Sequence, residues 1–453
     1  MEAGSVVIVG GGAAGLSAAY ALGKRGIKPI LLEIRDQAGG RLAGDRVGGF
    51  LVDTGARVFC HSNDVTFRIC EELGVPLVPS KPKFGWYRNG RWTTTTPGRS
   101  AANFLRNINI PSVYILFRDM LYQAAQLGAS SKGLERSRLE EQLSRLAVLD
   151  GDETFGAYLD RIGVPERLKV SLKGFMEMTM GHVEPFGQAA YIRTHLAEMM
   201  VYAKEFLVPE NGAAALARAL ATACGDAVRV STAVRRVVIR NGSVARVVTD
   251  DGPIKADAVI CAVPATKVTG LIPGLPAAIR HALGKVTYSI GCRAVIGLDR
   301  PPLPPGWHGA LYPEDDTPLL LDRSIEQPSC VPPGKSTLDM IVGRGQEMLS
   351  LADDEITREL LREARRVPPP GSALPGDDEW IFARVYRWRE AVCIGRPGMF
   401  NAIADMRRHI GRDVGNLFFA GDYMRTPSVN GALVSGVDAA AEAADLLARR
   451  SGG

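Results

Sequence analysis

A glycine-rich turn near the start of the chain restricts the possible folds more than any other feature. Gly10-Gly11-Gly12-Ala13-Ala14-Gly15 follows the apolar run Val6–Val9 and opens an Ala- and Leu-rich stretch from 13 to 25. In a G-x-G-x-x-G turn between a strand and a helix, the first glycine allows the tight turn and the second lets the backbone approach a pyrophosphate. The third allows close packing of the helix. The positive N-terminal end of such a helix favours phosphate. This turn therefore predicts a dinucleotide site.

An acidic residue at the end of the next predicted strand supports this interpretation. The strand covers Pro29 to Glu33, so Glu33 follows the glycines by about the distance expected of an acid that hydrogen-bonds a ribose hydroxyl. The strand, helix and second strand together predict an α/β domain.

The residues after Glu33 distinguish between possible dinucleotides. The chain continues through Arg35 to Gly39-Gly40-Arg41-Leu42. These residues form a second glycine pair followed by arginine, which an NAD site does not require. Here the sequence resembles the flavin amine oxidase superfamily, which includes monoamine oxidases, protoporphyrinogen oxidases and phytoene desaturases. The resemblance implies that this stretch wraps around the ADP half of FAD. It also implies that Arg35 and Arg41 neutralise the pyrophosphate and position the adenosine.

The resemblance extends along the whole chain. It implies that the segment ending in Gly55-Ala56-Arg57 passes the flavin ring, that Asp422 binds the ribityl chain, and that the helix starting near Gly431 points at the flavin pyrimidine. It further implies a backbone contact of Val234 with adenine. The predicted FAD contacts are Gly10, Gly12, Ala14, Gly15, Glu33, Arg35, Gly40, Arg41, Leu42, Gly55, Ala56, Arg57, Val234, Ala262, Trp388, Gly421, Asp422, Asn430, Gly431 and Ala432.

The order of patterns along the chain predicts two interleaved domains. We expect an α/β fold with a Rossmann-type FAD-binding domain built from 1–80, 206–290 and 386–453. A mixed α+β substrate-binding domain is expected from 81–205 and 291–385. Residues 112–127, 135–146 and 191–206 have helical periodicity. The alternating stretches between 227 and 264, with Asn241-Gly242 and Asp251-Gly252 at turns, predict a β-meander.

Two positions distinguish this chain from the amine-oxidising branch of the family. Monoamine oxidases carry a lysine after the meander, where a rough alignment gives Tyr288, and an aromatic residue where this chain has Ser428. The resemblance therefore favours the desaturase and protoporphyrinogen oxidase branch. In that branch Arg57 and Trp388 would lie near the flavin, and we expect these two as the catalytic residues. Methionines and aromatics of the predicted insertion form core or line a tunnel for an apolar substrate: Phe175, Met176, Met178, Met180, Met199, Met200 and Tyr202.

The expected reaction is removal of a hydride from a C–H bond of a small, apolar molecule, which leaves a C=C or C=N bond. Amine oxidation remains an alternative, as does an isomerase or a structural flavoprotein without net oxidation. No second nucleotide motif is present, so oxygen or a quinone-like molecule is the expected electron acceptor. The net charge of +5, with both signs interspersed, gives no nucleic-acid footprint. We expect a cytoplasmic protein; peripheral membrane contact and oligomeric state stay open.

Overall fold

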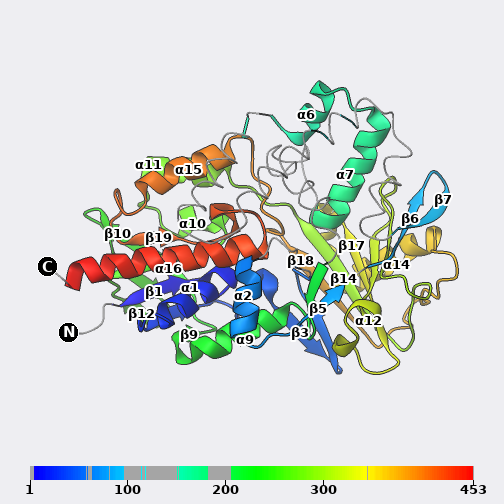
Figure 1. Cartoon of the computed structure of the whole chain (residues 1–453), viewed down its shortest axis with the longest axis horizontal. Helices are drawn as coiled ribbons and strands as arrows, with labels where there is room; N and C mark the ends of the chain where they lie inside the picture. The colour runs from blue at the N-terminus through cyan, green and yellow to red at the C-terminus, as the bar shows by residue number, and fades with distance from the viewer. Residues whose placement is uncertain are drawn as a thin grey trace.

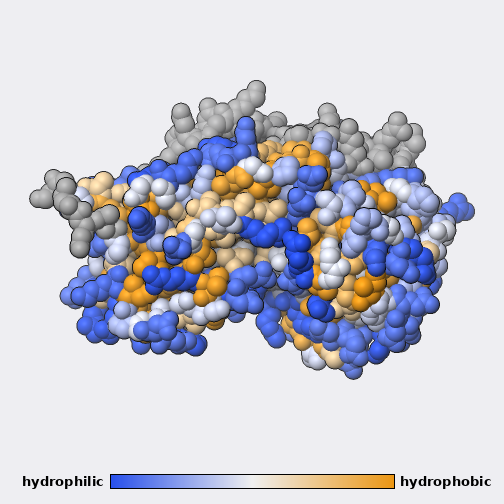
Figure 2. Space-filling view, turned by 90° about the horizontal axis from the view of Figure 1, so that it is seen from below, coloured by the Kyte–Doolittle hydropathy of each residue, from blue (hydrophilic) through white to orange (hydrophobic). Residues whose placement is uncertain are grey.

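The computed structural model describes residues 5–57, 59, 64–80, 82–95, 114, 118, 150–151, 153–181, 206–343 and 345–451. These residues form two lobes, one containing both ends of the described chain and one built around a large sheet (Figure 1). Seen from below, the lobes are separated by a waist, with apolar patches on both sides of a strongly hydrophilic band (Figure 2).

A parallel sheet forms the centre of the first lobe. Its strand order is β19-β13-β1-β2-β9, and Val6 of β1 aligns with Pro29 of β2 and Ala258 of β13. Every residue of β1 is buried, which explains its uninterrupted apolar sequence. The strands are β1 (Val6–Val9), β2 (Pro29–Leu32), β9 (Val228–Arg229), β13 (Ala258–Cys261) and β19 (Leu417–Phe419).

Two helices pack closely on each other against this sheet. These are α1 (Ala13–Gly23) and the long C-terminal α16 (Val429–Ser451), which lie side by side (Figure 1). A Cβ atom on Gly436 would lie 2.1 Å from the Ala14 carbonyl oxygen, so glycine is needed where the two backbones meet. Helix α1 ends two residues before the predicted end at Arg25. The other helices of this lobe are α2 (Asp64–Glu72), α9 (Ala214–Cys224), α10 (Ala265–Leu271), α11 (Ala277–Lys285) and α15 (Met399–His409).

The predicted meander is shorter than expected. Within the stretch predicted as a meander, the antiparallel sheet consists of β10 (Val234–Arg240), β11 (Ser243–Thr249) and β12 (Gly252–Ile254). The flanking strands β9 and β13 belong to the parallel sheet. Because apolar runs this short fit either kind of sheet, their pairing could not be predicted from periodicity.

The second lobe is built on a seven-stranded sheet with the order β18-β14-β17-β16-β15-β6-β7. Even-numbered residues of β14 and β17, such as Ala294 and Met340, point to a core that includes Leu360 and Leu361 of α14 (Asp353–Arg366). Odd-numbered residues of both strands, Arg293 and Asp339 among them, therefore face the other side. The strands are β6 (Phe84–Arg88), β7 (Arg91–Thr95), β14 (Gly291–Leu298), β15 (Gly309–Leu311), β16 (Leu319–Asp322), β17 (Ser336–Val342) and β18 (Phe382–Trp388).

Short elements connect the lobes or cover the large sheet. Helix α7 (Glu166–Met180) lies against the sheet through a stacked contact between Phe175 and Trp86, with ring centroids 5.9 Å apart. The remaining elements are β3 (Gly44–Val47), β4 (Phe50–Asp53), β5 (Leu77–Ser80), β8 (Phe206–Pro209), α6 (Phe155–Arg161), α12 (Arg323–Glu326), α13 (Gly345–Met348) and 3₁₀ turns at Gly40–Leu42, Gly225–Ala227, Pro328–Cys330 and Asp422–Met424.

The predicted domain limits can be compared with these elements. Strand β18 crosses the predicted limit at residue 386, because it starts at Phe382 and pairs with β14 of the large sheet. Most residues of the helices predicted at 112–127, 135–146 and 191–206 lie outside the described residues. Within the part of the chain that is described, no helix combines the length and apolar character needed to cross a bilayer.

Candidate cofactor site

The glycine turn is packed tightly at two positions and open at the third. A Cβ atom on Gly15 would lie 1.9 Å from the Gly10 carbonyl oxygen, and one on Gly10 would lie 2.9 Å from that of Ala262. Gly10 also has a φ of +106°, which disfavours other residues. At Gly12, by contrast, an added Cβ would meet no described atom within 4 Å. This turn thus joins α1 closely to the sheet and leaves its outer backbone open, which fits a bound pyrophosphate.

Glu33 is fixed beside this turn. One carboxylate oxygen accepts the Gly11 amide at 2.6 Å and the other accepts the Arg35 amide at 2.9 Å. The amides of Ser231 and Thr232 donate to the carbonyls of Arg35 and Glu33, so the segment leading into β10 passes the same place. Val234 is the first residue of that strand. The predicted ribose and adenine contacts are therefore neighbours, although they come from distant parts of the sequence.

Arg41 and Asp422 form a two-pronged ion pair between two 3₁₀ turns. The two guanidinium nitrogens of Arg41 lie 2.7 and 2.9 Å from the two carboxylate oxygens of Asp422. Burial opposes the charge of Arg41, but Asp422 outweighs it and raises the pKa of the guanidinium above its ordinary value. Arg41 retains 30% side-chain exposure and Asp422 only 7%. This pair is therefore closed on the Asp422 side and partly open on the arginine side.

The loop that carries Arg41 also contacts the other predicted sites. A Cβ on Gly40 would lie 3.2 Å from Gly12 Cα, and Leu42 is buried in the core of the first lobe. The amide of Ala56 donates to the Arg41 carbonyl at 2.9 Å. A Cβ on Gly55 would lie 2.3 Å from the same oxygen. The predicted flavin-passing segment is thus packed directly on the Arg41 loop.

Ser428 caps the first turn of α16. Its hydroxyl accepts the Gly431 amide at 2.9 Å and its carbonyl accepts the Ala432 amide at 3.0 Å. Nearby, the Asn430 side chain accepts the Thr66 amide at 3.0 Å, and the Gly421 amide donates to Ser435 at 2.8 Å. Ser428 therefore has a structural reason to be serine, because a cap requires a side-chain acceptor.

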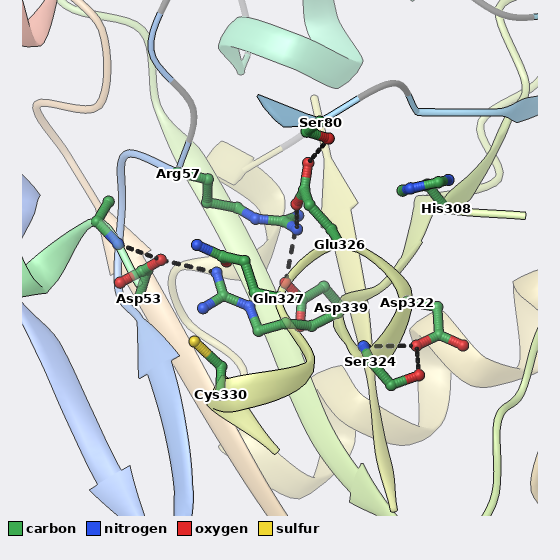
Figure 3. A network of polar contacts seen from close by, with 12 residues as sticks. Asp53, Arg57, Ser80, His308, Asp322, Ser324, Glu326, Gln327, Cys330 and Asp339 are labelled. Carbon is green, nitrogen blue, oxygen red and sulfur yellow. Dashed lines mark hydrogen bonds and ion pairs between the residues drawn. The ribbon is translucent and has the colours of Figure 1, made fainter. Parts of the chain in front are cut away.

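The two expected catalytic residues lie at the junction of the lobes. The indole N–H of Trp388 donates to the Thr54 carbonyl at 2.8 Å, and the Arg35 guanidinium lies over its ring, 5.0 Å from the centroid. The Arg57 guanidinium pairs with Glu326 at 2.7 Å and lies 3.5 Å from Asp339 (Figure 3). The structure therefore brings both residues to the Thr54–Arg57 segment but places the Arg57 guanidinium in a buried ionic network.

This network was not predicted as a unit. It joins Asp53 and Arg57 of the first lobe to residues of the second, and Ser80 donates to Glu326 at 3.3 Å (Figure 3). A charged residue inside an otherwise apolar strand, as at Arg293 or Asp339, was the signal that could have revealed it. Its remaining members are Arg293, Arg323, Glu326 and Asp339.

Residues expected to define the substrate are only partly described. Met176 and Met180 are buried in the core, and Phe175 is half-buried beside Trp86. Tyr288 accepts the Ala265 amide at 3.2 Å and lies under Arg41, with 5.3 Å from its ring centroid to the guanidinium. Burial raises the pKa of the Tyr288 hydroxyl well above its ordinary value. Met199, Met200, Tyr202 and the side chain of Met178 lie outside the described residues.

Several known proteins are similar to this chain. The phytoene dehydrogenase of Streptomyces griseus is 26% identical over 431 residues, which cover 86% of this chain and 84% of that protein. A flavin-containing monoamine oxidase of Mycobacterium tuberculosis, AofH, is 28% identical over 283 residues. That match covers 57% of this chain and 56% of AofH, so the chain matches about half the length of this curated relative.

The fold and the family are shown by a solved structure and by a family match. Putrescine oxidase bound to putrescine superposes with a TM-score of 0.76 over 98% of this chain and 99% of that chain, at 19% identity. This likeness confirms a fold of mixed helices and sheets. Residues 13–444 match the family described as flavin containing amine oxidoreductase, which confirms the predicted family and its FAD cofactor. The chain therefore belongs to the flavin containing amine oxidoreductase family.

Proposed function

We propose that this protein holds FAD along the carboxyl edge of the parallel sheet and oxidises a C–H bond of a small, apolar organic molecule to a C=C or C=N bond. When bound, FAD supplies the oxidising chemistry. The observation that carries the proposal is the meeting of the open Gly12 backbone, the fixed Glu33 carboxylate and the Arg41–Asp422 pair. Together they provide a Rossmann-type phosphate site, a ribose acceptor and a cation next to it.

Each of these groups has a definite task toward the cofactor. The N-terminal turn of α1 stabilises the pyrophosphate through its backbone amides and its dipole. Glu33 accepts a ribose hydroxyl, since its orientation is already fixed by the Gly11 and Arg35 amides. Arg41 offers its partly exposed guanidinium to phosphate, whereas Asp422 accepts from the ribityl chain.

The apolar substrate is supported by the face of the large sheet next to Arg57. Phe84, Trp86, Leu321 and Ile341 are half-buried there and surround Leu311 and Leu319. Such a surface favours a substrate through burial, at about 25 cal/mol per Å² of apolar area. Ser428, which caps α16, stands where amine oxidases are expected to carry an aromatic residue, and Tyr288, which accepts a backbone amide, stands where they are expected to carry a lysine.

Two alternatives stay in competition with this function. Amine oxidation is favoured by the fold shared with putrescine oxidase and by the partial match to AofH. A flavin-dependent isomerase or a structural flavoprotein would use the same cofactor site without net oxidation. In the oxidase proposal, oxygen or a quinone-like acceptor reoxidises the flavin.

The first experiment identifies the cofactor and the second the substrate class. Heat or acid should release FAD from the purified protein, and chromatography distinguishes it from FMN. Anaerobic stopped-flow mixing with polyenes and reduced porphyrins, and with benzylamine and polyamines, then follows flavin bleaching. Bleaching by the apolar set supports the proposal, and bleaching by a simple amine alone contradicts it. Bleaching by none of them, with chemical change of a substrate, favours the isomerase.

A further inference from the structure

The ionic network at the lobe junction is almost completely buried. Arg293 of β14 and Asp339 of β17 have side chains that are 7% and 0% exposed. Burial lowers the pKa of the Arg293 guanidinium, with Arg57 and Arg323 adding to this effect against the attraction of Asp339. Burial also opposes ionisation of Asp339, but the three arginines hold the pKa of its carboxyl below the ordinary value. The network is therefore a set of buried charges that offset one another.

Arg293 reaches across the junction to the end of β4. One guanidinium nitrogen donates to the Asp53 carbonyl oxygen at 2.7 Å, and the other donates to Asp339. Arg323 of α12 pairs with the Asp53 carboxylate at 2.8 Å. That carboxylate also accepts the amides of Ala213 and Ala214, each at 3.0 Å, at the N-terminal end of α9. Three elements thus fix the last residue of β4.

The segment after β4 transmits this restraint toward the cofactor site. Thr54 is held by the Trp388 indole at 2.8 Å, and Ala56 is held by the Arg41 carbonyl at 2.9 Å. Arg41 is the residue that pairs with Asp422. A displacement of Asp53 would therefore move the predicted flavin-passing segment relative to both Trp388 and Arg41.

Stability alone gives a poor reason for such an arrangement. Buried ion pairs can often be replaced by apolar residues without loss of stability, and their best-attested benefit is a fixed register between elements. Within the described residues, the Nε atoms of Arg57, Arg293 and Arg323 have no hydrogen-bond partner, so the network is not fully satisfied. A small apolar cluster of Phe50, Val52, Val295 and Val331 already packs the same junction.

We propose that Arg293 is a positioning residue: through the Asp53 carbonyl it sets how the Thr54–Ala56 segment lies against Trp388, and hence the surroundings of the flavin ring. This inference rests on the proposed function. Arg293 does not need to contact the cofactor in order to have this effect. Loss of Arg293 should change the flavin environment while the cofactor-binding groups Glu33, Arg41 and Asp422 remain in place.

The test uses the FAD-loaded protein and a double variant, Arg293→Met with Asp339→Leu, which leaves neither of these two buried charges behind. Arg57 keeps its partner Glu326 in this variant. Arg293→Lys is the conservative variant, because it preserves the charge but not the two-ended guanidinium. Arg88→Met is the matched control, since Arg88 lies on the same sheet, is 16% exposed and pairs with Glu314 at 2.7 Å.

We expect the double variant to bind FAD within about threefold of the parent affinity. Its visible circular dichroism should lose at least half of the flavin signal, and its reduction equilibrium against a reference dye should shift at least fivefold. Arg293→Lys should fall between the double variant and the parent, and Arg88→Met should match the parent.

Three outcomes would overturn the inference. If the double variant has the flavin signal and reduction equilibrium of the parent, the inference about Arg293 is wrong, whereas the proposed function is unaffected. Equal changes in Arg88→Met would do the same, since the effect would then be general to the sheet. A parent protein that holds no FAD would overturn the proposed function, and the inference with it.

Discussion

Two Arg–Asp pairs of similar chemistry lie in very different surroundings. Arg41–Asp422 is formed at the cofactor site and leaves 30% of the arginine side chain exposed. Arg293–Asp339 is closed, with 7% and 0% exposure. An arginine with free surface can accept a second anionic partner, whereas a closed pair cannot without leaving a charge buried. The first arrangement is suited to binding a cofactor and the second to fixing a backbone.

Removal of the closed pair's acid should have the largest effect. Asp339→Ala leaves Arg293 and, in part, Arg57 without a partner, so we expect the free energy of unfolding of the apoprotein to fall by about 3–5 kcal/mol. Urea denaturation followed by tryptophan fluorescence measures it. The control is Asp250→Ala, which removes an exposed partner of Arg235 and should change little. Equal effects of both variants would remove the distinction between open and closed pairs.

The open region should respond in cofactor affinity. Glu33→Ala removes a charge-assisted hydrogen bond to the ribose, worth about 1.5–3 kcal/mol, or roughly 10- to 150-fold in the dissociation constant. Titration of the apoprotein with FAD measures the change. Glu33→Gln, which retains an acceptor, should recover part of the loss. Stoichiometric FAD in Glu33→Ala after dialysis and gel filtration would show that the assigned role is wrong.

The glycine turn contains the same contrast on a smaller scale. Gly15→Ala would place a Cβ 1.9 Å from a backbone oxygen, so it should cost about 1–3 kcal/mol of apoprotein stability as well as FAD affinity. Gly12→Ala meets no described atom within 4 Å, and we expect it to weaken FAD binding at least tenfold while stability stays at the parent level. Thermal unfolding of the two apoproteins, with FAD titration, separates the effects. A stability loss in Gly12→Ala would mean that its side is not open.

Asp422→Ala should weaken FAD binding less than Glu33→Ala. The ribityl contact is lost, but the freed Arg41 guanidinium becomes more available to phosphate, which offsets part of this loss. The net loss of FAD binding free energy should be about 1 kcal/mol. The same titration measures it, and Arg41→Met provides the matched removal of the other partner. A larger loss for Asp422→Ala than for Glu33→Ala would mean that the pair acts as a fixed unit, like Arg293–Asp339.

The two regions also differ in how far the sequence predicted them. The glycine turn and Glu33 belong to a local pattern whose spacing follows from neighbouring strands and one helix, and Arg41 was expected from the family resemblance, so all three could be predicted before the structure was known. Arg293 and Asp339 meet only because β14 pairs with β17 in one particular register. Periodicity indicates that a strand exists but does not give its partner. The same limit explains why β9 and β13 were predicted in a meander.

The smallest expected effect concerns pH and tests whether burial dominates around the junction. Burial raises the pKa of Asp322 above its ordinary value, against hydrogen bonds from Ser324 and Ser336. Because the folded protein then binds this proton more tightly than the unfolded chain, its ionisation costs stability as the pH rises from the ordinary pKa through the raised one. Asp322→Asn keeps an acceptor oxygen for both serines but cannot ionise. We therefore expect the variant to gain stability relative to the parent across that window and to keep a constant advantage above it. The pH dependence of Asp339 has the opposite sign: because its pKa is lowered, its contribution to stability is lost only as the pH falls below the ordinary value.

Urea denaturation of the parent and Asp322→Asn apoproteins at a series of pH values measures the difference. A difference that is constant throughout, or that favours the parent at higher pH, would show that the hydrogen bonds outweigh burial at Asp322.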